Sequence, residues 1–153
     1  MQHKNSLWWI SITLILFPIL VLLGLLMRGI QADAIADTQA LFYPSMTLHG
    51  IGNVGVWYVA SMATALIVTS KYAPIQVGVS WFALIGTVIG VVLLLASVLI
   101  GRFAAGWYFL YPLPLMSQGA WPTWAAVTFL ASITVLGTTW LIWTLASLVA
   151  IAK

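Results

Sequence analysis

The stretch VGVSWFALIGTVIGVVLLLASVLI, residues 77–100, decides the fold class of this chain. It contains no Asp, Glu, Lys or Arg. It is also longer than the about 20 helical residues that cross the hydrocarbon core of a bilayer. Backbone N–H and C=O groups find no water in lipid, so a segment of this kind satisfies them internally by forming a helix. The stretch therefore predicts a transmembrane helix.

Three further segments share this length and lack of charge, at residues 7–27, 46–69 and 122–151. The first is longer than the core of a secretory signal, and no small-residue cleavage pattern precedes Arg28, so we expect it to be retained. The chain is 63% hydrophobic and 5% charged, as integral membrane proteins are. We therefore predict an all-α bundle of four transmembrane helices forming one domain, residues 1–153.

The charged side chains indicate how the bundle is oriented. Three lysines fall on one predicted side of the membrane, and two arginines and two aspartates fall on the other: Lys4, Lys71 and Lys153 against Arg28, Arg102, Asp33 and Asp37. Basic residues favour the cytoplasmic side, so we expect both termini there. No basic cluster is available to bind nucleic acid. The absence of cysteine excludes disulfides and thiolate metal sites.

His49 is the residue most indicative of function. It lies just inside the second predicted span, where an ionisable side chain is costly and by default marks a functional site. Small or short side chains follow it at helical spacing, namely Gly52, Asn53, Val56, Ala60 and Ala63. Such a face suits a flat macrocycle held by an axial imidazole, as haem iron is. Small residues also let membrane helices pack closely, and a lone histidine can hydrogen-bond across that contact. The GxxxG at residues 86–90 is assigned to packing alone.

Two stretches carry a resemblance to a known family. The segment FYPSMTLHGIGN, residues 42–53, resembles the start of the second helix in subunit I of haem–copper oxidases, closest to the B-type, ba3-like branch with its TLHG-x-x-N pattern. The segment WYFLYPLPL, residues 107–115, resembles the Y-x-x-YPPL segment of that family, although Leu113 separates two prolines that are normally adjacent. The hairpin 70–76 has no acidic residue, which is more similar to the B-type branch.

The resemblance implies that His49 is an axial ligand of a low-spin haem of b or a type. It implies that the chain is the N-terminal portion of a split subunit I in a terminal respiratory oxidase of a prokaryotic cell membrane. The partners implied are the remainder of subunit I on a separate chain, which supplies the second axial ligand and the haem–copper centre, and a subunit II-type electron-entry protein. The chain is not catalytic alone, since too few histidines are present.

Further residues are weaker candidates for this haem site. Gly52 and Asn53 would line the haem face, and Arg102, Tyr108 and Tyr111 would lie in the outer loop near the haem. Two alternatives stay open: a homodimeric cytochrome b, and a haem-free accessory or assembly subunit of a respiratory complex. The electron donor is not encoded in these residues.

Overall fold

A computed structural model describes residues 2–36, 39–105 and 119–153. The described chain forms four helices, α1 (Gln2–Gln31), α2 (Gln39–Thr69), α3 (Val77–Leu95) and α4 (Thr123–Ile151), and a π-helical turn, η1 (Ala96–Ile100), extends α3. Each helix, with η1 counted as part of α3, is long and apolar enough to cross a bilayer. The all-α, multi-pass membrane fold expected from the sequence is confirmed.

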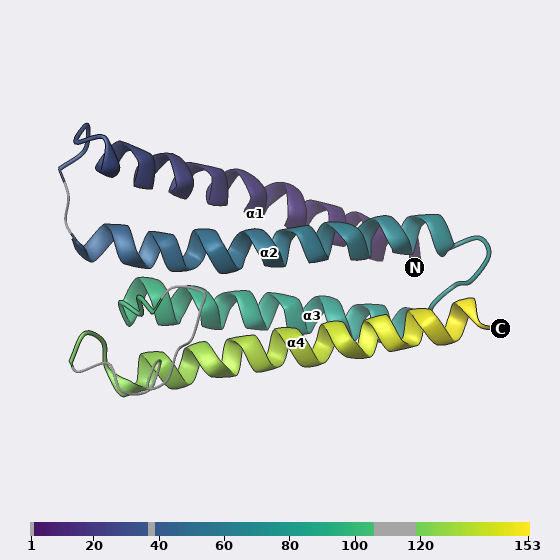
Figure 1. The fold of residues 1–153 in the computed structure, drawn as a ribbon. Helices are drawn as coiled ribbons and strands as arrows, with labels where there is room; N and C mark the ends of the chain where they lie inside the picture. Colours follow the sequence, from purple (N-terminus) through teal and green to yellow (C-terminus); the bar gives the residue numbers. More distant parts are fainter. Residues whose placement is uncertain (1, 37–38, 106–118) are drawn as a thin grey trace.

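The four helices run alternately up and down, as Figure 1 shows. Both termini lie at the same end of the bundle as the α2–α3 connection, and the opposite end holds the end of α1, the start of α2, η1 and the start of α4. Lys4, Lys71 and Lys153 thus belong to one end, and Arg28 and Arg102 to the other. The predicted division of the basic residues is confirmed, while the placement of the lysine end in the cytoplasm stays a prediction.

Three of the prolines lie within a described helix or at its start. Pro122 is the N-cap of α4, with extended φ −72° and ψ 151°. Pro44 lies in the second turn of α2 and Pro18 lies inside α1, so each removes one backbone hydrogen bond of its helix. Both α1 and α2 start several residues before the predicted spans at 7–27 and 46–69, since α1 begins at Gln2 and α2 at Gln39.

The helices pack most closely in two pairs, α1 with α2 and α3 with α4. In the second pair, a Cβ built on Gly90 would lie 2.5 Å from Cγ of Leu136. Ser132 Oγ then donates to the Gly90 carbonyl oxygen at 2.7 Å. Glycine thus allows the backbones to approach, and the packing role assigned to the GxxxG is confirmed by Gly86, whose added Cβ would overlap Thr139.

Candidate functional site

His49 lies in the first half of α2, where its half-buried imidazole reaches across to α1. Its Nδ1 is 2.7 Å from the carbonyl oxygen of Leu20. A carbonyl oxygen only accepts hydrogen bonds, so Nδ1 carries the proton and donates it. This tautomer leaves Nε2 with its lone pair. The contact between α1 and α2 therefore fixes which ring nitrogen of His49 can act as a base or a ligand.

Asn53, one turn further along α2, contacts the histidine without competing for this proton. Its Nδ2 donates to the carbonyl oxygen of His49 at 2.7 Å. The same amide nitrogen lies 3.2 Å from His49 Nδ1, but two donors cannot bond to each other. Asn53 therefore holds the backbone of the histidine turn rather than its ring.

Gly24 supplies the space that the imidazole occupies against α1. A Cβ built on Gly24 would lie 2.6 Å from His49 Cε1, 3.1 Å from Nδ1 and 3.3 Å from Nε2. Real Cβ atoms essentially never come within 3.0 Å of such a neighbour. The Nδ1–Cε1–Nε2 edge of the ring is thus seated on the bare backbone of α1, and a side chain at this position would displace it.

Gly52, one turn after His49 on α2, makes the converse contact, in which a side chain of α1 packs on a glycine of α2. A Cβ on Gly52 would overlap the side chain of Leu20. The face of α2 that carries His49 and Gly52 is therefore packed against α1. Of the other small residues predicted on that face, Val56 and Ala63 are buried and Ala60 is half-buried.

The remaining predicted site residues come from the sequence between η1 and α4, of which the structure describes residues 101–105 and 119–122. Arg102 follows η1 directly, is exposed, and has a left-handed backbone conformation with φ 54°. It follows η1 at the end of the bundle where α2 begins, and His49 is nearer to the start of α2 than to its end. Tyr108, Tyr111 and Asp37 lie outside the described residues. In the ranges that the structure describes, no three His, Asp or Glu side chains group to hold a metal ion.

Two partners of His49 were not singled out from the sequence. The Leu20 carbonyl belongs to the backbone, so no side-chain motif marks it. Gly24 is one small residue in the apolar part of α1. Its i+4 spacing from Leu20 is the sequence feature that could have linked it to the site.

Comparisons with known proteins give no match: no family model, no curated protein and no solved structure is similar to this chain. Its function is therefore inferred from its residues and their geometry.

Proposed function

We propose that this chain is part of a terminal haem–copper oxidase, in which His49 is an axial ligand of a low-spin haem. The observation that carries the proposal is the tautomer of His49. Its Nδ1 donates to the Leu20 carbonyl oxygen at 2.7 Å, which leaves Nε2 as the nitrogen able to bind iron. Histidines that bind metals almost always donate their other N–H in this way.

The residues around His49 fit such a ligand in two respects. The bond to Leu20 fixes the orientation of the ring and increases the electron density on Nε2. The absence of a side chain on Gly24 makes room for the imidazole itself, whose Nδ1–Cε1–Nε2 edge packs on the α1 backbone. When bound, haem iron would supply reversible one-electron transfer at this depth in the membrane.

A complete site requires residues from outside these 153. The chain has only one other histidine, His3, so one copy cannot supply both axial ligands and three copper ligands. We propose that the remainder of subunit I, on a separate chain, carries the second axial ligand of the haem and the oxygen-reducing centre. A subunit II-type protein would deliver the electrons, and the assembly would lie in a prokaryotic cell membrane with both termini of this chain in the cytoplasm.

A second candidate function is a haem-free accessory subunit, and a specific observation favours it. The same ring of His49 already joins α1 to α2 through the Leu20 carbonyl and is seated closely on Gly24. An interhelical hydrogen bond of this kind stabilises a membrane helix pair by about 0.6 kcal/mol on average. In this candidate, His49 needs no ligand at Nε2.

The deciding experiment is haem analysis of the complex purified from its own membranes. His49→Ala is compared with His3→Ala, which removes the other histidine of the chain. We expect His49→Ala to abolish the reduced-minus-oxidised spectrum of the low-spin haem and His3→Ala to retain it. A full low-spin haem content in His49→Ala would refute the assignment. Wild-type complex without haem would instead establish the accessory subunit.

A further inference from the structure

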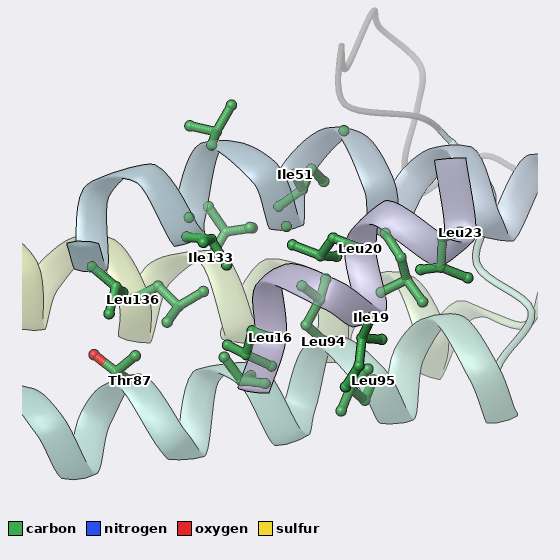
Figure 2. A pocket seen from close by; sticks show the side chains of 18 of the residues that line it. Leu16, Ile19, Leu20, Leu23, Ile51, Thr87, Leu94, Leu95, Ile133 and Leu136 are labelled. Carbon is green, nitrogen blue, oxygen red and sulfur yellow. The ribbon is translucent and has the colours of Figure 1, made fainter. Parts of the chain in front are cut away.

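An apolar cavity of about 430 Å³ lies between the two helix pairs, separate from the His49 ring. Figure 2 shows side chains from all four helices surrounding it, among them Leu16 of α1, Ile51 of α2, Leu94 of α3 and Leu136 of α4. All four helices are candidate membrane spans, and the residues that line the cavity lie within these spans. Its surroundings in a cell would be the hydrocarbon core of the bilayer.

The lining offers no free hydrogen-bonding side chain to a ligand. Thr87 carries the hydroxyl group of the cavity, and this hydroxyl donates to the Ala83 carbonyl oxygen at 2.8 Å. The Thr87 hydroxyl oxygen in turn accepts from Trp140 Nε1 at 2.9 Å, which satisfies the indole N–H as well. A polar or charged ligand would therefore lose its hydration without finding a partner, so the cavity selects an apolar occupant.

The volume of the cavity indicates which apolar group can occupy it. Empty apolar cavities stay dry, and one of about 150 Å³ takes up a single benzene molecule. The 430 Å³ space thus matches roughly three six-carbon units. A transmembrane helix about 10 Å wide and about 30 Å long occupies roughly 2,400 Å³, which is far more than the volume of the cavity. The space accommodates one hydrocarbon chain and not a further helix.

Exposed residues form part of the lining, so the cavity is open sideways. Ile19 on α1 and Leu99 on η1 line it and are 48% and 56% exposed. Both side chains are apolar, and both would face lipid in a bilayer. We infer that this cavity binds the acyl chain of a membrane lipid, which enters laterally from the bilayer. The inference is independent of the function proposed for His49.

The glycines of the chain provide a filling variant and a matched control. Gly137 lines the cavity, and a Cβ added there meets nothing within 4 Å. Gly78, at the start of α3, has equally open space but does not line the cavity. Gly137→Leu therefore adds a side chain to the cavity lining at a position where the added Cβ meets nothing, and Gly78→Leu makes the same chemical change elsewhere. Gly55→Val is a second filling variant, because an added Cβ there makes only ordinary contact with Trp140 at 3.4 Å.

The full chain is reconstituted in lipid nanodiscs that contain phosphatidylcholine with a diazirine in the middle of one acyl chain. After irradiation, mass spectrometry locates the adducts. We expect adducts concentrated on the lining residues Leu16, Leu94 and Leu95, at least fivefold fewer in Gly137→Leu and Gly55→Val, and unchanged in Gly78→Leu. Adducts spread evenly over outward-facing residues such as Leu14 and Leu145, with the same yield in every variant, would overturn the inference.

Discussion

Replacing Gly24 by alanine places one methyl group against the imidazole of His49. The new Cβ would lie 2.6 Å from Cε1, inside the distance that real Cβ atoms keep. The ring cannot simply retreat, because its Nδ1 is tied to the Leu20 carbonyl oxygen at 2.7 Å. The substitution therefore forces either the loss of this hydrogen bond or a separation of α1 from α2.

The size of the effect follows from opposing contributions. Overpacking a close contact costs about 1–3 kcal/mol. Loss of the interhelical hydrogen bond, worth about 0.6 kcal/mol on average, is one part of that cost. Alanine in a helix interior is favoured over glycine by about 0.5–1 kcal/mol. We expect Gly24→Ala to lower the free energy of unfolding by about 1–2 kcal/mol, the net of the middle values.

The assay is reversible unfolding of the chain in mixed micelles by titration with dodecyl sulfate. The control is Gly137→Ala, where an added Cβ meets nothing within 4 Å and stabilisation by about 0.5–1 kcal/mol is expected. Nitrogen-15 shifts of the His49 ring report whether the proton stays on Nδ1. If Gly24→Ala is as stable as Gly137→Ala and leaves the ring resonances unchanged, then the imidazole is not seated on α1.

Two further packing contacts give testable outcomes in the same titration. Ser80 accepts from Trp9 Nε1 at 3.2 Å and donates to Asn5 Oδ1, so Ser80→Ala leaves buried polar atoms on both partners unpaired. We expect it to lower stability by about 1–3 kcal/mol, and a change below the error of the titration would contradict the network. Gly86→Ala brings a Cβ into overlap with Thr139, and the cost of overpacking less the gain in helix propensity gives an expected loss of about 1–2 kcal/mol. An unfolding midpoint equal to or above that of the wild type would show that α3 and α4 are not in close contact there.

The site was only partly predictable from the residues. A histidine at lipid depth is conspicuous because ionisable side chains are rare there, so His49 could be selected without coordinates. Its tautomer could not, because the proton position depends on the Leu20 carbonyl, which belongs to another helix. The role of Gly24 could not be predicted for the same reason, because it depends on the His49 ring of another helix that packs against it.

The amino-acid sequence alone determined the number of helices, their approximate bounds and their alternating direction. A charge-free segment long enough to cross the bilayer is stable there as a helix, which satisfies its backbone hydrogen bonds internally. Consecutive spans that each cross the bilayer once then run in opposite directions. Only the tertiary structure decided which faces of these helices meet. In lipid, the inward and outward faces of a span are both apolar, so hydrophobic periodicity does not distinguish them. The seat of His49 on α1 and the cavity between the helix pairs arise from the shapes of small and large side chains, which fit together only in three dimensions.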